Sequence, residues 1–251
     1  MDKKIKHHLA VILDKSGSME SIAQQAITTY NEQVQTARAR AKDFDISVTL
    51  VTFNYDINFT RFAEPIDGVK DLTQDEYRPN GGTPLNDAVA ITIEKIKEWV
   101  EKQNEKVDVL VCIISDGEEN QSKKYPGVGN KELAEIVQTM QQKHGWTFTY
   151  AGTNDYDLSK TAKAMNIPMA NVTSFARSVQ GTMKFAHAHN AASRNYYDTR
   201  SAQNYAGSID QLSAPVACFY TNTKTDGGAN NVDTNQTKSV TENTTNKKAK
   251  K

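Results

Sequence analysis

An uninterrupted apolar run, Leu9–Leu13, constrains the fold of this chain more than any other stretch of its sequence. A strand with one face in water alternates apolar and polar residues, whereas a continuous apolar run is typical of a strand covered on both faces. Val107–Ile114 is a second strongly apolar segment, in which Asp108 is the one charged residue. We therefore expect both segments to be central strands of a sheet that lies between layers of helices.

The other periodic segments alternate between helix and strand. Apolar residues recur at helical spacing from Met19 to Lys42. Ile46–Phe53 alternates like a strand, with Ile57–Phe62 as its hairpin partner. Further along, the patterns predict helices over 85–101, 130–143 and 155–165 and strands over 147–151 and 171–175. This alternation is typical of an α/β fold with a doubly wound sheet.

The pattern weakens after Ser178, and we expect three segments in the chain. Residues 1–176 are predicted to form the α/β domain, and residues 177–220 an Ala-rich helical or irregular extension. Residues 221–251 contain six Lys against three acidic residues and few apolar side chains, so they have little surface to bury. We predict that this last segment is a disordered, basic, polar tail.

Composition narrows the class of protein. The 251 residues include 30 Lys and Arg and 30 Asp and Glu, and this balance gives no support to a general nucleic-acid-binding role. Two cysteines, Cys112 and Cys218, do not make a disulfide framework, and no apolar stretch is long enough to span a membrane. Asp14 interrupts the first apolar run too early for a signal peptide. We expect a soluble cytoplasmic protein, or one associated with a virion if a phage encodes it.

Oxygen-bearing side chains follow both central strands. Asp14, Ser16 and Ser18 come directly after the first strand, Asp116 comes after the second, and Thr83 precedes the helix predicted over 85–101. Open α/β sheets bind ligands at the carboxyl ends of their strands. Oxygen donors suit a hard cation such as Mg²⁺ or Mn²⁺. Two carboxylates with three hydroxyls make a site poor in acid, which leaves the metal an open position for a carboxylate from a partner.

These residues resemble the metal-ion-dependent adhesion site of von Willebrand factor A domains. The resemblance spans about residues 5–176 and rests, in order, on Asp14-Lys15-Ser16-Gly17-Ser18, Gly82-Thr83-Pro84-Leu85 and Ser115-Asp116-Gly117. It implies a Rossmann-like, mostly parallel sheet with one antiparallel edge strand and helices on both faces. It also implies that Ser16, Ser18 and Thr83 contact Mg²⁺ directly, and that Asp14 and Asp116 bind directly or through water. Residues 145–148 and 151–154 resemble the intracellular bacterial and phage-borne branch, which includes tellurite-resistance-associated proteins.

Local structure offers simpler explanations for some of these polar residues. Ser18 suits the N-cap of the helix that follows it, and Thr83 suits the N-cap of the helix over 85–101, with Pro84 in its first turn. Asp87 is interpreted as a helix-start acid favoured by the helix dipole. Glu118 and Glu119 are expected to lie in a solvated loop, and His7 and His8 in a solvated segment that leads into the first strand. His187 and His189 are expected at surface or packing positions.

An enzyme is a further alternative. Asp14 after a buried strand also suits the nucleophile of a phosphoryl-transfer enzyme. Enzymes related to haloacid dehalogenases carry a second Asp two positions on as the general acid, and this chain has Ser16 there. The sequence contains neither a phosphate-binding P-loop motif nor a nucleophile elbow. We therefore expect no enzymatic activity.

The main functional prediction is a divalent-metal-dependent protein-binding module that captures an acidic side chain, Asp or Glu, of a partner at the top of the sheet. The Ala-rich extension and the polar tail support an alternative, a structural or assembly protein of a phage particle or another large complex. We expect neither a membrane nor nucleic acid as the partner. The sequence does not indicate an oligomeric state.

Overall fold

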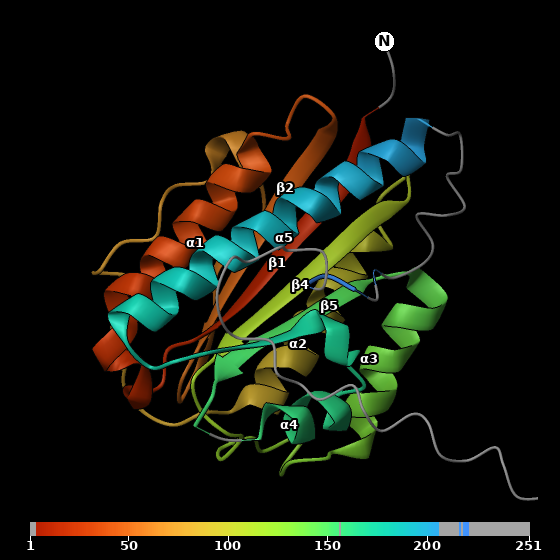
Figure 1. The fold of residues 1–251 in the computed structure, drawn as a ribbon. Coiled ribbons are helices and arrows are strands. Elements are labelled where there is room, and N and C mark those ends of the chain that lie inside the picture. The colour runs from red at the N-terminus through yellow and green to blue at the C-terminus, as the bar shows by residue number, and fades with distance from the viewer. Residues whose placement is uncertain (1–3, 156, 206–215, 217, 221–251) are drawn as a thin grey trace, which may run out of the picture.

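The computed structural model describes residues 4–155, 157–205, 216 and 218–220. Within them, six strands form one sheet in the order β3-β2-β1-β4-β5-β6 (Figure 1). The strands are β1 (Ile5–Asp14), β2 (Phe44–Phe53), β3 (Ile57–Pro65), β4 (Val107–Ser115), β5 (Thr147–Thr153) and β6 (Val172–Phe175). Neighbouring strands are parallel except β2 and β3, which form an antiparallel hairpin at the edge. The predicted Rossmann-like sheet with one antiparallel edge strand is confirmed.

Helices cover both faces of the sheet (Figure 1). They are α1 (Ala23–Arg38), α2 (Leu85–Val100), α3 (Lys131–His144), α4 (Leu158–Ala164) and α5 (Val179–Tyr205), with short 3-10 helices at Gly17–Ile22, Ile66–Gly68 and Met169–Asn171. Side chains of a strand point alternately to its two faces. Val11 accordingly joins the core beneath α1 and α5, and Ile12 joins the core beneath α2, α3 and α4. Both faces of β1 are buried, which is why its central run has no polar residue.

Strand β1 begins ahead of that apolar run. His7 and His8 are buried within it, so the prediction of a solvated lead-in was wrong. His7 Nδ1 lies 3.0 Å from Asp108 Oδ2 on β4, and His8 Nδ1 lies 2.8 Å from Ser47 Oγ on β2. Because neighbouring strands supply polar partners for both rings, the strand can extend back to Ile5.

Helix α5 lies along α1 (Figure 1) and ends at Tyr205, within the extension predicted over 177–220. His187 is exposed on it, whereas His189 is buried with its Nδ1 2.8 Å from the hydroxyl of Tyr220. These are the surface and packing positions that the sequence predicted. The aromatic residues that α5 and the following segment add to the core of this face are Phe185, Tyr196, Tyr197, Phe219 and Tyr220. The tail predicted over 221–251 lies outside the described residues.

A buried polar cluster fixes α5 over the starts of the central strands. Arg200 Nη2 lies 3.1 Å from Asp108 Oδ1, and Tyr196 donates a hydrogen bond of 2.7 Å to Asp108 Oδ2. His7 contacts the same Oδ2. Burial alone would raise the pKa of Asp108, but the hydrogen bond from His7 and the charge of Arg200 hold that pKa below its ordinary value. The cluster therefore contains an ionised carboxylate that is compensated by its partners.

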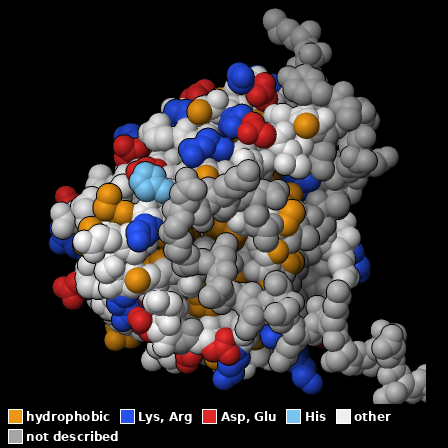
Figure 2. All heavy atoms as spheres, in the orientation of Figure 1, with side chains coloured by type: hydrophobic (Ala, Val, Ile, Leu, Met, Phe, Trp, Pro, Cys, Tyr) orange, Lys and Arg blue, Asp and Glu red, His pale blue; other side chains and the backbone are white. Residues whose placement is uncertain are grey.

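The visible surface carries no large patch of one charge. On the face formed by α1 and α5, the described Lys and Arg side chains are intermixed with Asp and Glu side chains (Figure 2). Nucleic-acid binding generally uses a basic stripe or patch, and the described side chains visible on this face do not form one (Figure 2). Among the described helices, none is long and apolar enough to cross a membrane.

Candidate functional site

The ends of β1 and β4 place the two predicted carboxylates at the same edge of the sheet. The strands are parallel neighbours, with Leu13 paired to Ile114, so Asp14 lies beside Ser115. Ser115 donates a hydrogen bond of 2.6 Å to Asp14 Oδ2. Asp116 follows directly, and both aspartates are fully buried. The carboxyl edge of the sheet thus holds two acids away from water.

The loop after β1 joins these acids through its serines. The backbone N–H of Ser16 donates to Asp14 Oδ1 at 2.7 Å, which folds the loop back over the strand end. Ser16 Oγ lies 3.1 Å from Ser18 Oγ, and Ser18 Oγ donates to Asp116 Oδ1 at 2.7 Å. A continuous chain of hydrogen bonds therefore links four of the five residues predicted as metal ligands.

Thr83, the fifth predicted ligand, arrives on a separate loop. The N–H of Gly17 donates to the carbonyl of Gly81 at 3.1 Å, so the loop before α2 lies against the loop after β1. A methyl group added to Gly117 would lie 3.3 Å from Thr83 Oγ1 and 3.8 Å from Ser18 Oγ. Both hydroxyls therefore lie close to Gly117. The structure brings all five predicted residues to one place.

The hydroxyls are not used for helix capping. Helix α2 begins at Leu85, after Pro84, so the predicted N-cap role of Thr83 was wrong. Ser16 precedes the 3-10 helix Gly17–Ile22 without a side-chain cap bond, and Ser18 lies inside that helix. Within the described part of the chain, the Thr83 hydroxyl takes part in no hydrogen bond. None of the three hydroxyls is therefore committed to capping a helix.

Two acidic residues, Asp87 and Glu119, hold the loop after β4, although no local pattern groups them. Asp87 accepts hydrogen bonds from the backbone N–H of Lys123 at 2.7 Å and of Tyr125 at 2.8 Å. Glu119 accepts one from the N–H of Asn86 at 2.8 Å, so the prediction that Glu119 is merely solvated was wrong. Asp87 does lie in the first turn of α2, as predicted. The partners are 33 to 38 positions apart, and a local pattern carries no signal for such pairs.

Burial shifts the pKa of both candidate carboxylates upward. Burial raises the pKa of Asp14 to about 7, although hydrogen bonds from two serines oppose the shift. Burial also raises the pKa of Asp116, against the hydrogen bond from Ser18 and the charge of Arg177. Asp116 Oδ2 is buried, and no hydrogen-bond partner for it is found among the described residues. A divalent cation would favour the ionised form of both carboxylates, and the all-oxygen donor set fits Mg²⁺ or Mn²⁺.

A centre rich in histidine, cysteine or carboxylate is absent from the described residues. No group of three or more His, Cys, Asp or Glu side chains there could hold a metal ion. The candidate site contributes only Asp14 and Asp116 to such a count, and its other donors are hydroxyls. The site is therefore poor in acid, as the sequence indicated.

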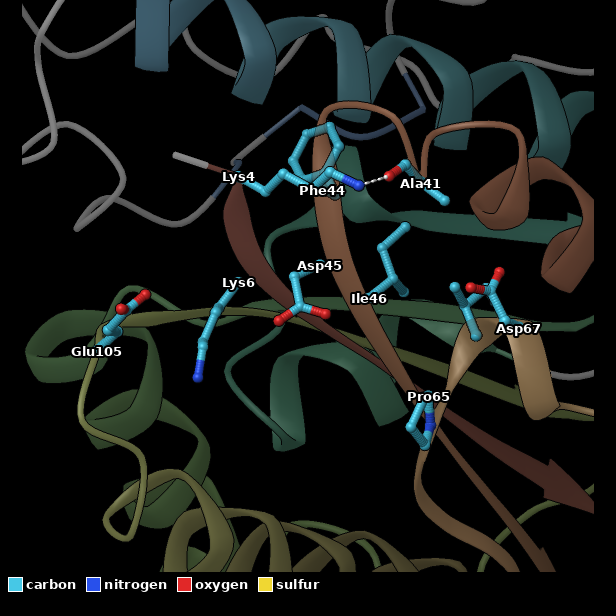
Figure 3. A pocket seen from close by; sticks show the side chains of 10 residues that line it. Lys4, Lys6, Ala41, Phe44, Asp45, Ile46, Pro65, Asp67 and Glu105 are labelled. Atoms are coloured by element: carbon cyan, nitrogen blue, oxygen red, sulfur yellow. Dashed lines mark hydrogen bonds between the residues drawn. The ribbon is translucent and has the colours of Figure 1, made fainter. Parts of the chain in front are cut away.

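A pocket of about 370 Å³ lies at the opposite end of the sheet (Figure 3). It is lined by residues at the starts of β1 and β2, including Lys4, Lys6 and Asp45, and by Asp67 and Glu105 nearby. The length of β1, about 33 Å for ten residues, separates it from the candidate site. Its lysines and carboxylates are intermixed rather than directed at one point (Figure 3), so we assign it no role in the site.

Comparison with known proteins supports the same fold. The similar solved structures include a von Willebrand factor type A protein from Catenulispora acidiphila, at 14% identity over 76% of this chain and 43% of that one, with a TM-score of 0.50. Proximal thread matrix protein 1 from the mussel byssus matches at 14% identity over 75% and 48%, with a TM-score of 0.52. A mutant of the PilB minor pilin from Streptococcus sanguinis matches at 11% identity over 79% and 64%, with a TM-score of 0.51.

The chain spans less than two thirds of each of these structures, and at such identities the likeness concerns the fold alone. No curated protein sequence matches it. The family model of the von Willebrand factor type A domain matches residues 8–184, which is more than half of the chain. The chain therefore belongs to the von Willebrand factor type A domain family.

Proposed function

We propose that this domain binds Mg²⁺ or Mn²⁺ through Asp14, Ser16, Ser18, Thr83 and Asp116, and captures an acidic side chain of a protein partner there. The observation that carries the proposal is the meeting of two buried carboxylates and three hydroxyls, none of which caps a helix, at one edge of the sheet. A divalent cation held there would supply positive charge and a coordination position for a carboxylate.

The composition of the site favours a negatively charged ligand. Asp14 and Asp116 offset at most two positive charges, and only when both are ionised. The hydroxyls of Ser16, Ser18 and Thr83 are neutral donors. A carboxylate from an Asp or Glu side chain is a hard oxygen ligand of matching chemistry, so it would complete the coordination that these residues leave unfinished.

An exposed aromatic residue at the rim supports a protein as the partner. Tyr55, 72% exposed, lies in the turn between β2 and β3 at the same edge of the sheet. Its ring packs against Gly81, where a methyl group would lie 2.7 Å from two ring carbons. Gly81 in turn bonds to Gly17 of the candidate site. Exposed tyrosines are frequent anchors of protein interfaces, so we expect the partner to place an apolar group beside its acidic one.

We further propose a cytoplasmic, non-enzymatic role. The two cysteines are separate, with Cys112 buried and Cys218 exposed, which suits a reducing compartment. The site offers ligands rather than an activated nucleophile with a base. The alternative, an assembly protein, was based partly on the expectation that the Ala-rich segment docks on other components of an assembly. Helix α5 packs on the sheet of its own chain, so that segment requires no outside partner.

Calorimetry tests the metal site directly. Titration of the wild-type protein with Mg²⁺ should show binding, and Asp14→Ala should abolish it because it removes one of only two carboxylates. Asp67→Ala is the matched control, since Asp67 is exposed at the opposite end of the sheet. Equal Mg²⁺ affinity in the wild type and Asp14→Ala would contradict the assignment.

Affinity capture tests the function. The immobilised domain should retain a partner in Mg²⁺ and release it in chelator, and Asp14→Ala should retain nothing in either buffer. Candidate partners should then lose binding when one Asp or Glu of theirs is replaced by its amide. Retention that is indifferent to chelator would show that the interaction does not pass through the metal.

A further inference from the structure

Arg177 lies between β6 and α5 and reaches the candidate metal site. Its Nη2 donates a hydrogen bond of 2.7 Å to the main-chain carbonyl of Asp116. Its Nε lies 3.3 Å from Asp116 Oδ2, the buried oxygen for which the described residues provide no hydrogen bond. The guanidinium thus brings positive charge to the one carboxylate oxygen of the site that is otherwise uncompensated.

The backbone around Arg177 is closely packed. A methyl group added to Gly181, in the first turn of α5, would lie 2.3 Å from the carbonyl oxygen of Ala176. The N–H of Ser178 donates to that carbonyl at 2.7 Å, and the N–H of Thr182 donates to Ser178 at 2.9 Å. The backbone at residues 176–182, which forms the corner between β6 and α5, has no room to shift toward the helix. The fold therefore holds Arg177 beside Asp116.

We propose that Arg177 is a built-in competitor of the metal ion at Asp116. The inference rests on the proposed metal site and concerns its regulation. Arg177 pairs with Asp116 in the absence of metal, which spares the protein a buried, unpaired carboxylate. The same positive charge repels a divalent cation at that carboxylate, and the cation must draw Asp116 away from the guanidinium. Arg177 therefore lowers the affinity of the site for metal.

Asp155 gives Arg177 a second place to bind. Arg177 Nε lies 3.5 Å from Asp155 Oδ2, and the Asp155 side chain is 56% exposed while that of Arg177 is 34% exposed. Arg177 can keep this contact when it gives up Asp116, so metal uptake does not require the corner at 176–182 to unfold. The result is a site that holds metal weakly on its own and more firmly once a partner adds its carboxylate.

Mg²⁺ titration of charge variants tests the proposal. Arg177→Gln removes the charge but keeps an amide donor for the Asp116 carbonyl, and it should bind Mg²⁺ on the order of tenfold more tightly than the wild type. Arg177→Lys keeps the charge and should stay within about threefold of the wild type. Arg194→Gln is the control, because Arg194 is exposed on α5 about 25 Å further along the chain at 1.5 Å per residue.

Thermal unfolding supplies a second readout. In chelator, Arg177→Gln should melt at a lower temperature than the wild type, because Asp116 is then buried without the positive charge of Arg177. Saturating Mg²⁺ should reduce this difference in melting temperature. If the wild type binds Mg²⁺ and Arg177→Gln binds it no more tightly, the competitor role is wrong while the metal site stands. Weaker binding by Arg177→Gln would instead make Arg177 a residue that positions Asp116 for the metal. If neither the wild type nor Arg177→Gln binds Mg²⁺, both the site and the competitor role fail.

Discussion

At the scale of single residues, three hydroxyls separate the candidate site from an ordinary turn between a strand and a helix. In such a turn a Ser or Thr hydroxyl bonds to an amide of the first helical turn. Here Ser16 and Thr83 precede helices without capping them, and Ser18 donates to Asp116 instead. Gly117 leaves space beside two of these hydroxyls, because any side chain there would press on Thr83. The local chemistry therefore favours a ligand over a cap.

Thr83 gives the cleanest test at this scale. Thr83→Ala removes a hydroxyl that bonds to nothing in the described chain together with a buried methyl group, so it should lower the stability by about 1 kcal/mol. Its Mg²⁺ affinity should fall by about tenfold or more, because a direct oxygen donor is lost. Thr83→Ser keeps the hydroxyl and should retain most of the affinity. Calorimetry and urea unfolding measure the two quantities, and equal Mg²⁺ affinity in the Ala and Ser variants would show that the hydroxyl is not a ligand.

At the scale of helices and strands, the elements with a local pattern were predictable from the sequence. The apolar run of β1 and the alternation of β2 predicted both strands and the hairpin with β3. Such strands can be predicted because the order of apolar and polar residues along a strand shows which of its faces are buried. The five candidate ligands could be grouped because they lie at strand or helix ends that a doubly wound sheet brings together. Features that depend on distant partners could not be predicted. The start of α2 is held by Glu119, the start of β1 by Asp108, and Asp116 by Arg177.

Among these contacts between distant residues, the buried cluster around Asp108 that anchors α5 is expected to contribute most to the stability of the fold. Asp108→Asn would keep the size of the side chain but remove the charge that faces Arg200 and His7 in a buried setting. Breaking a buried ion pair from one side costs about 3 kcal/mol or more. We expect urea unfolding to show a destabilisation of that size, with the midpoint of unfolding clearly lowered.

An aspartate on α5 itself provides the matched control for that measurement. Asp198 pairs with Arg40 at 2.6 Å, but its side chain is 60% exposed. Exposed ion pairs contribute about 0–1 kcal/mol, so Asp198→Asn should change stability little. Equal, small effects of the two substitutions would mean that the buried cluster does not anchor the helix.

At the scale of the whole molecule, α5 shares one face of the sheet with α1 and runs from one end of that face to the other. Its 27 residues span about 40 Å, the length of the sheet and more. Near its start, Arg177 contacts the carboxyl edge of the sheet, and near its end Arg200 contacts the opposite edge through Asp108. Between them, His189 is buried against aromatic rings. The burial of a titratable ring at the centre of this packing makes the stability of the fold sensitive to acid.

Burial lowers the pKa of His189 to about 4, and it lowers the pKa of His8 to about 3 with a further contribution from the charge of His7. Both values lie below the ordinary value of about 6.5 in an unfolded chain. As pH falls below about 6.5, the unfolded chain therefore takes up protons that the folded protein does not. The stability that each neutral ring contributes is full above this pH and declines as pH falls toward the folded pKa. At 1.36 kcal/mol per unit, each ring should cost about 2 kcal/mol between pH 7.5 and pH 5.

Other groups titrate in the same range, so a variant must isolate the effect. In the metal-free protein the raised pKa of Asp14 acts in the opposite direction, because the folded state then binds the proton more readily. Comparing His189→Gln with the wild type at each pH cancels that contribution. The stability difference between the two proteins should shift by about 2 kcal/mol in favour of the variant from pH 7.5 to pH 5. His187→Gln, an exposed position on the same helix, should show no such shift, and a shift of equal size in both variants would rule out burial of His189 as its cause.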